Sequence, residues 1–232
     1  MTAYTRDDHS GTGPGEITRD GCAVEMYAGL GDHGETGIIA AAVPPGARTL
    51  LELGSGAGRM TRPLLARGFG VTAVDESPGM LERISGARTV RSSIEDLMLG
   101  ERFDVVTLTS FLVNTADPVA RARLLATCAR HVEADGCVVV QRQSDTRDGD
   151  LTPGRSWVRD GTTITVVSVD PADEGAVRSC FRYENGGRVW TQTFYSYPLT
   201  RKEAEQALNG AGLAVDAWLT DDGSWVRAVP AP

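Results

Sequence analysis

Uninterrupted apolar runs alternate with helix-like segments from residue 35 to residue 143. Runs of this kind predict strands that are covered on both faces, as in a parallel sheet. Strands are expected at Thr49–Leu53, Gly70–Val74, Thr89–Arg91, Asp104–Leu108 and Cys137–Gln141. Helices are expected between them at Glu35–Val43, Arg59–Arg67, Met80–Ile84 and from Asp117 to about Glu133. This alternation indicates an α/β fold with a Rossmann-like, doubly wound, mainly parallel sheet.

The pattern changes after residue 150, where β-branched and aromatic residues predict an antiparallel meander. Strands are expected at Thr162–Val169, Val177–Tyr183 and Arg188–Tyr197. The last two flank Asn-Gly-Gly, which is a strong hairpin signal. If Asn185 and Gly186 form the turn, Phe181 faces Trp190 and four aromatic side chains share one face. We interpret residues 150–198 as an inserted β-meander lid that covers the substrate pocket.

The C-terminal segment predicts an antiparallel edge to the main sheet. A capping-box pattern at Thr200 and Glu203 opens a helix that runs to about Asn209. Two further strands are expected at Leu213–Thr220 and Ser224–Val229. We therefore expect a single domain over residues 21–232. The polar, glycine-rich residues 1–20 are expected to form a mobile tail.

Composition limits the classes of function. The chain has 232 residues, 41% of them apolar, and a formal net charge of −8. An acidic surface disfavours a nucleic-acid partner. No apolar run reaches the roughly 20 residues of a membrane span, and no signal peptide opens the sequence. The four cysteines lack metal-type spacing, so no metal site is expected. Together, these features predict a cytoplasmic protein that acts on a small molecule.

Residues 50–80 have the pattern of a nucleotide-binding loop. Three alternate glycines follow a predicted strand and open a helix, so that backbone N–H groups can approach a ligand. Asp75 ends the next strand, where an acid accepts hydrogen bonds from ribose hydroxyls. A dinucleotide loop places its third glycine one position later, and Glu52 would repel two phosphates. The loop therefore favours a nucleoside ligand without a pyrophosphate.

The segment Glu52-Leu-Gly54-Ser55-Gly56-Ala-Gly58 resembles the E/D-x-G-x-G-x-G motif of class I S-adenosylmethionine-dependent methyltransferases. The resemblance implies S-adenosylmethionine as cofactor and S-adenosylhomocysteine as product. It also implies that Glu52 faces the ammonium of the methionine end, where Coulomb attraction favours an acid. Residues 71–80 resemble the second motif of the family, which would place Asp75 on the ribose and Met80 near the adenine.

The resemblance extends to residues that would line the rest of the cofactor. The third motif usually has an aspartate before an apolar residue, and Ser93 and Ile94 stand at these positions. Either Ser93 contacts the adenine amine, or Glu95 or Asp96 takes the role of the aspartate. Residues just past the fourth predicted strand would line the methionine portion. The expected cofactor-binding residues are Glu52, Gly54, Ser55, Gly56, Gly58, Asp75, Glu76, Met80, Ser93, Ile94, Glu95, Thr109 and Ser110.

Three residues are candidates for positioning roles in catalysis. Tyr27 ends a segment that resembles D-G-x-x-V-E-x-Y in small actinobacterial members of the family, and it would either close over the cofactor or anchor the segment. Asn114 stands where related proteins often carry a histidine, and an amide can orient an amine but cannot remove a proton. This slightly favours N-methylation over O-methylation. Arg142 would clamp a substrate carboxylate or form an internal salt bridge.

The expected function is methyl transfer to a small-molecule acceptor in natural-product biosynthesis, by a monomer or homodimer. Two alternatives remain open. The first is an S-adenosylmethionine-dependent enzyme that cyclises or rearranges its substrate instead of methylating it. The second is a non-catalytic partner protein that binds the cofactor. The mass of the product distinguishes transfer from rearrangement, since only transfer adds one methylene.

Overall fold

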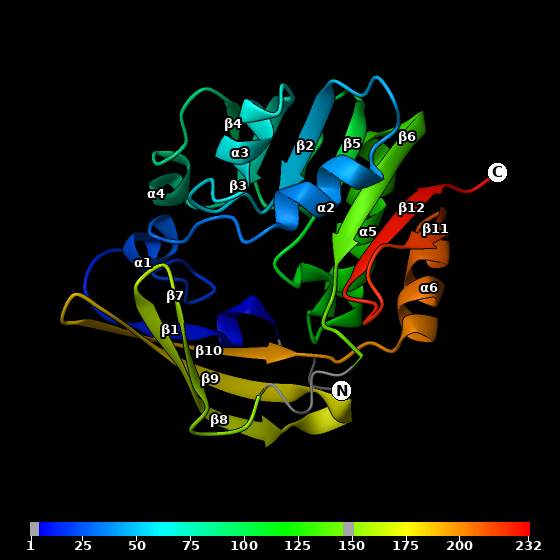
Figure 1. Cartoon of the computed structure of the whole chain (residues 1–232). Coiled ribbons are helices and arrows are strands. Elements are labelled where there is room, and N and C mark those ends of the chain that lie inside the picture. Colours follow the sequence, from blue (N-terminus) through cyan, green and yellow to red (C-terminus); the bar gives the residue numbers. More distant parts are fainter. Residues whose placement is uncertain (1–4, 146–150) are drawn as a thin grey trace.

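The chain is described by a computed structural model over residues 5–145 and 151–232, in which it forms two sheets (Figure 1). The larger sheet has seven strands in the order β11-β12-β6-β5-β2-β3-β4. These are β2 (Thr49–Leu53), β3 (Gly70–Asp75), β4 (Arg88–Arg91), β5 (Phe103–Leu108), β6 (Val132–Gln141), β11 (Leu213–Trp218) and β12 (Trp225–Pro230). Only β11 and β12 run antiparallel to their neighbours, so the predicted fold class, including its antiparallel edge, is confirmed.

Helices cover both faces of this sheet. They are α2 (Glu35–Ala42), α3 (Thr61–Ala66), α4 (Pro78–Leu81), α5 (Pro118–His131) and α6 (Arg201–Gly210). Leu124 of α5 and Leu208 of α6 belong to one core with alternate residues of β2. Ile39 of α2 and Leu64 of α3 belong to a second core on the opposite face. The two cores explain why the central strands are apolar at nearly every position.

Side-chain caps fix the starts of three helices. The Ser77 hydroxyl accepts a hydrogen bond from Met80 N at the start of α4. Asp117 does the same for α5, with Pro118 at its first position. Thr200 opens α6 with the predicted capping box. Each cap satisfies backbone donors that a helix cannot pair internally.

The second sheet has five strands in the order β1-β10-β9-β8-β7. They are β1 (Ser10–Thr12), β7 (Ser156–Arg159), β8 (Thr162–Pro171), β9 (Val177–Asn185) and β10 (Arg188–Ser196). Figure 1 shows this sheet lying across the end of the molecule toward which the parallel strands point. Its aromatic residues, among them Phe181, Tyr183 and Trp190, pack against Ala23 and Met26. The insertion thus lies at the carboxyl ends of the parallel strands.

The β9–β10 hairpin differs from the expected register by two residues. Tyr183 pairs with Trp190, and Asn185 pairs with Arg188, so the turn consists of Gly186 and Gly187. Both glycines have positive φ, 55° and 77°, which is the requirement of a type I′ turn. Because the shift is even, the aromatic side chains still share one face, as expected.

The N-terminal segment also differs from the expectation. The sequence predicts a mobile tail over residues 1–20, of which residues 1–4 lie outside the described part. From residue 5 the chain is folded onto the body, with a 3₁₀ turn η1 (Arg6–Asp8) and with β1 paired to β10. An edge strand joins a sheet through its backbone, so a polar composition does not prevent this pairing. Helix α1 (Val24–Ala28) follows.

Candidate cofactor-binding and active site

The glycine loop joins β2 to α3 at the carboxyl edge of the sheet. The backbone N–H groups of Gly54 and Ser55 both donate to Val74 O at 2.9 Å, which ties the loop to the end of β3. Gly54, Gly56 and Gly58 have φ values of 71°, 53° and 83°. This left-handed region is costly for residues with a Cβ atom, so the backbone of the loop requires glycine at all three positions.

The three glycines differ in what surrounds them. A Cβ atom on Gly54 would lie 2.6 Å from Leu112 Cδ1, and one on Gly58 would lie 2.9 Å from Ile84 Cγ1. A Cβ atom on Gly56 would meet nothing within 4 Å. A side chain at the first or the third position would therefore also have to displace a neighbouring side chain. The middle glycine faces open space, on the side where a ligand can approach.

Glu52 is a fully buried acid on β2. Its Oε2 atom accepts a hydrogen bond from Thr61 Oγ1 at 2.6 Å, while Oε1 has no partner. Burial raises the pKa of this carboxyl to about 7. A buried, half-satisfied carboxylate is costly unless a cation or a donor completes it. Glu52 thus has one acceptor atom available for an ammonium group.

Asp75 is held in one orientation by the loop itself. Its Oδ2 accepts from Gly56 N at 2.8 Å and its Oδ1 from Ser77 N at 2.9 Å. Burial raises its pKa above the usual value, against these two hydrogen bonds. The neighbouring Glu76 forms an ion pair with Arg6. Met80 is buried and packs against Val24 and Ala57 of the loop, which gives it a packing role.

The third predicted motif divides into a buried and an exposed part. Ile94 is buried, and its Cδ1 would lie 3.5 Å from a Cβ atom on Gly54, so it lies beside the loop. Ser93 instead donates to Asp96 Oδ2 at 2.7 Å at the surface. Glu95 forms an ion pair with Arg6. Of these residues, Ile94 is in direct contact range of the glycine loop.

The chain just past β5 has a strained backbone. Ser110 and Phe111 are consecutive non-glycine residues with φ values of 55° and 61°. Gln141 holds this turn by accepting a hydrogen bond from Ser110 N at 2.8 Å. The preceding Thr109 is fully buried, and its Oγ1 has no partner. Local strain of this kind clusters at functional sites, and no sequence pattern indicated it at Phe111.

Three buried side-chain oxygens without a partner thus belong to residues expected to bind the cofactor. They are Glu52 Oε1, Ser55 Oγ and Thr109 Oγ1. Buried polar atoms are normally satisfied, so such a group indicates a missing donor. The ammonium and hydroxyl groups of S-adenosylmethionine are donors of the required kind, and these residues fit that cofactor.

The contacts of Asn114 differ from those expected of a residue that orients an acceptor. Its side chain is buried, its Nδ2 donates to Tyr197 O at 2.9 Å, and its Oδ1 accepts from Gln143 N at 2.8 Å. It lies in the 3₁₀ turn η2 (Leu112–Asn114). Both ends of the amide therefore fasten the main sheet to the segment after β10. These contacts give Asn114 a structural role in the fold.

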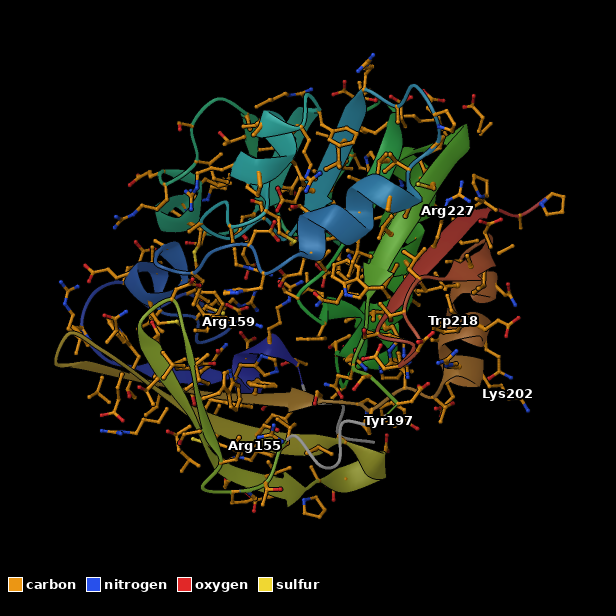
Figure 2. All side chains as sticks on the ribbon, viewed as in Figure 1. Arg155, Arg159, Tyr197, Lys202, Trp218 and Arg227 are labelled. Atoms are coloured by element: carbon orange, nitrogen blue, oxygen red, sulfur yellow. The ribbon has the colours of Figure 1, made fainter. Side chains whose placement is uncertain are left out.

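Arg142 is also engaged within the fold, in agreement with the second of its two readings. The side chain is 1% exposed. Its Nη1 donates to Asp145 Oδ1 at 2.8 Å and Gly223 O at 2.7 Å, and its Nη2 donates to Leu199 O. The guanidinium also lies 5.7 Å from the ring centre of Trp218, which Figure 2 shows at the edge formed by β11 and β12. A substrate clamp is therefore not its role.

Replacing Arg142 with methionine is expected to lower the free energy of unfolding by about 2 kcal/mol, because two buried carbonyl groups lose their donor. The KM for an acceptor should stay unchanged. Urea unfolding and steady-state kinetics measure the two effects. The control is Arg201→Met, because Arg201 contacts the same Asp145 and Trp218 but is 39% exposed. Its loss should cost well under 1 kcal/mol. A raised KM with unchanged stability would instead indicate that Arg142 clamps a substrate carboxylate.

Tyr27 lies in α1 and packs against the core of the second sheet. Its hydroxyl donates to Gln192 Oε1 at 2.9 Å, and Tyr183 donates to the same oxygen at 3.4 Å. Burial raises the pKa of the Tyr27 hydroxyl well above its usual value. Gln192 was missed by sequence reasoning, although it is the polar residue between Trp190 and Phe194 on the aromatic face of β10. These contacts favour the anchoring role of Tyr27.

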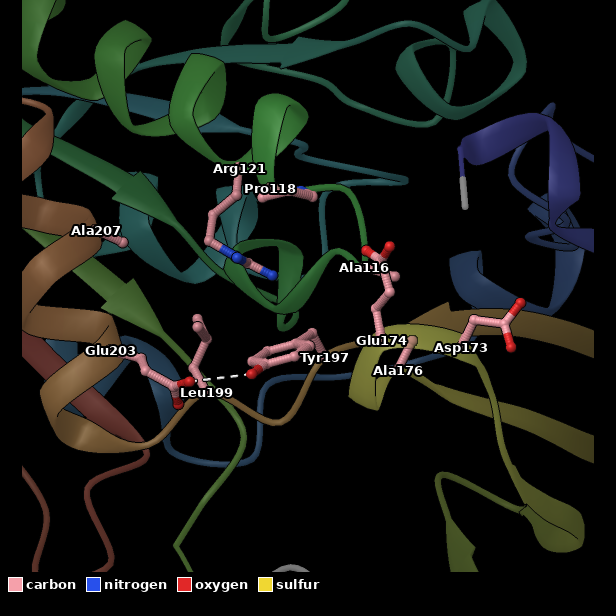
Figure 3. A pocket seen from close by; sticks show the side chains of 10 residues that line it. All are labelled: Ala116, Pro118, Arg121, Asp173, Glu174, Ala176, Tyr197, Leu199, Glu203 and Ala207. Carbon is pink, nitrogen blue, oxygen red and sulfur yellow. Dashed lines mark hydrogen bonds between the residues drawn. The ribbon is translucent and has the colours of Figure 1, made fainter. Parts of the chain in front are cut away.

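A separate hollow of about 280 Å³ lies beside the start of α5 (Figure 3). Arg121 lies over the ring of Tyr197 at 5.3 Å from its centre, and the Tyr197 hydroxyl donates to Glu203 Oε1 at 3.0 Å. None of the residues expected to bind cofactor lines it. The hollow is therefore distinct from the glycine loop.

In the described part of the chain, no helix is long and apolar enough to cross a membrane.

Solved structures with a similar fold include methyltransferases. A methyltransferase from Clostridium acetobutylicum ATCC 824 superposes with a TM-score of 0.69 at 13% identity, covering 89% of this chain and 92% of that one. CalS10, an amino pentose methyltransferase from Micromonospora echinaspora, gives 0.68 at 22% identity, covering 89% and 95%. KedS8, a sugar N-methyltransferase from Streptoalloteichus sp. ATCC 53650, gives 0.65 at 21% identity, covering 90% and 87%.

Sequence comparison points to the same family. No curated protein sequence matches the chain significantly. Residues 51–140, from β2 to the end of β6, match the family described as methyltransferase domain. This region contains the glycine loop, Asp75, Ile94 and Thr109. Residues 51–140 thus match a methyltransferase domain, and the chain as a whole has the fold seen in S-adenosylmethionine-dependent methyltransferases, in agreement with the resemblance of the motifs.

Proposed function

We propose that this protein binds S-adenosylmethionine at the glycine loop and transfers its methyl group to an amine of a small molecule, such as an amino sugar, in natural-product biosynthesis. The observation that carries the proposal is the group of unpartnered buried oxygens on Glu52, Ser55 and Thr109 around the loop. The cofactor, when bound, supplies a methyl group activated by the adjacent sulfonium. The chain then needs only to align an acceptor with that methyl group in a dry site.

The choice of an amine rests on the absence of a free histidine base. His9 accepts a hydrogen bond from Tyr195 N at its Nε2, and His33 pairs through Nε2 with Asp160. Both ring nitrogens of His131 contact backbone atoms at the end of α5. A neutral amine needs no strong base, whereas a hydroxyl gains from one. KedS8 is a sugar N-methyltransferase and CalS10 is an amino pentose methyltransferase, and both support the same acceptor class.

The proposal includes a cytoplasmic location, a monomer or homodimer, and no nucleic-acid partner, in line with the acidic composition. Calorimetry with S-adenosylhomocysteine and with NAD tests the cofactor, and binding of NAD alone would overturn it. Incubation with S-adenosylmethionine and a panel of amino sugars, followed by mass spectrometry, tests the reaction. A product heavier by one methylene is expected. An unchanged mass would favour rearrangement, and tight binding without turnover would favour a non-catalytic partner.

A further inference from the structure

The N-terminal segment, defined here as residues 5–28, connects the second sheet to the nucleoside side of the glycine loop. At one end, β1 pairs with β10. At the other end, Val24 of α1 packs against Ala57 and Met80. Between these ends the Ser77 hydroxyl donates to Glu16 Oε1 at 3.5 Å. The segment therefore lies against the residues expected to bind the adenosine part of the cofactor.

Arg6 joins this segment to the loops that follow β3 and β4. Its Nη2 atom donates to both carboxylate oxygens of Glu95, at 2.6 and 2.8 Å, and its Nη1 atom donates to Glu76 Oε2 at 3.1 Å. The Glu95 side chain is 13% exposed and the other two are 27% exposed. All three side chains keep some contact with water, so dissolved salt can still weaken the pairs. Arg6 is thus a bridge between two carboxylates.

The fold explains why these carboxylates lie together. Strands β3 and β4 are parallel neighbours, with Asp75 paired to Arg91, so their carboxyl ends meet. Glu76 follows β3 directly, and Glu95 lies four residues past β4. Together with Asp75 they place three acidic residues at one edge of the sheet. Like charges at this spacing repel one another, and Arg6 opposes that repulsion. Arg91 contributes at the same edge by donating to the backbone carbonyl of Glu76 at 3.3 Å.

We propose that Arg6 is a positioning residue for the nucleoside end of the cofactor. It holds Glu76 and Glu95 in place and fastens the N-terminal segment across the cofactor edge, so that cofactor release requires this ion pair to open. The inference rests on the proposed function, since it assigns the edge beside Asp75 to the adenosine of S-adenosylmethionine. It follows that Arg6 acts on the rate of cofactor release more than on the rate of binding. Salt should accelerate release, because it weakens the pair.

The test is the dissociation rate of S-adenosylhomocysteine from the full chain, measured by stopped-flow displacement at 0.05 and 0.5 M salt. Arg6→Gln should accelerate release about five- to tenfold and abolish most of its salt dependence. Arg6→Lys should restore part of the effect. The control is Arg19→Gln, because Arg19 forms a similar pair with Asp7 in the same segment, at 2.7 Å, but with both side chains more than 60% exposed. It should release the ligand like the unmodified protein.

Two other results would overturn the proposal. Equal release rates and equal salt dependence for Arg6→Gln and the unmodified protein would overturn the proposal. So would equal acceleration in Arg6→Gln and Arg19→Gln, which would indicate general loosening of the segment. Arg6→Gln and Arg19→Gln should have the same midpoint of thermal unfolding. If the unmodified protein binds no S-adenosylhomocysteine, the proposed function fails. If it binds the ligand but the dissociation rate does not depend on Arg6, only this inference is overturned.

Discussion

Replacing Glu52 with glutamine is expected to stabilise the unliganded protein at pH 8 and, at the same pH, to weaken its binding of S-adenosylhomocysteine. The two effects have opposite signs because Glu52 is buried with one oxygen lacking a partner. Ionised Glu52 is costly in the empty site, and the ammonium of the ligand offsets that cost. A residue that served the fold alone would lose stability when replaced.

The effect on stability follows from the pKa of Glu52. Burial raises it from 4.5 to about 7 in the folded protein. The folded state therefore binds the proton more tightly than the unfolded state, and the associated stability is complete below pH 4.5. It is lost as the pH rises through 7, by about 3 kcal/mol in total. The glutamine variant lacks this loss, so its stability should fall less between pH 5 and pH 8 than that of the unmodified protein.

The effect on binding has the opposite dependence on pH. The ammonium of the ligand favours the ionised form of Glu52, so affinity should rise about tenfold from pH 6 to pH 8 as this carboxyl loses its proton. Glu52→Gln should remove this rise and weaken binding at pH 8 about ten- to a hundredfold, the value of a charge-assisted hydrogen bond.

Urea unfolding and calorimetry at both pH values measure the two dependences. Glu101→Gln is a suitable control, because Glu101 pairs with Arg88 at the surface. It should change neither dependence. If Glu52→Gln lowered stability at pH 8, or kept the rise in affinity with pH, the assignment of Glu52 to the ammonium would be wrong.

The sequence contained enough information for the order of elements and for the edge of the sheet where we expect the cofactor. Apolar runs covered on both faces have few alternatives to a parallel sheet, and the carboxyl ends of such strands meet. Glu52, the three glycines and Asp75 were therefore brought together as expected. Their chemistry depends on local backbone geometry, which neighbours in sequence determine.

The roles of Asn114 and Arg142 depended on partners far along the chain. Asn114 bonds to Tyr197, and Arg142 bonds to Leu199 and Gly223. Sequence reasoning placed both residues at the correct edge of the sheet but could not give the direction of their side chains. The same limit applies to the N-terminal segment, where β1 pairs with β10 through backbone groups that no sequence pattern marks.

Replacing Gly56 with alanine is expected to weaken S-adenosylhomocysteine binding about a hundredfold while the protein remains folded. The Cβ atom of alanine would point into the space where nothing lies within 4 Å, which is the space we assign to the ligand. Forcing a methyl group into an occupied site costs up to about 3 kcal/mol. The backbone N–H of residue 56 stays in place, so its hydrogen bond to Asp75 is retained.

Gly68 provides a control that separates strain from contact with the ligand. It follows α3, has a φ of 92°, and a Cβ atom there would also meet nothing within 4 Å. Gly68→Ala should therefore carry the same left-handed penalty as Gly56→Ala, about 1–2 kcal/mol of stability in both variants. Only Gly56→Ala should lose affinity in calorimetry. Equal affinities in the two variants would mean that the open side of Gly56 does not hold the ligand. A loss in both would mean that backbone strain, and not contact, governs binding at the loop.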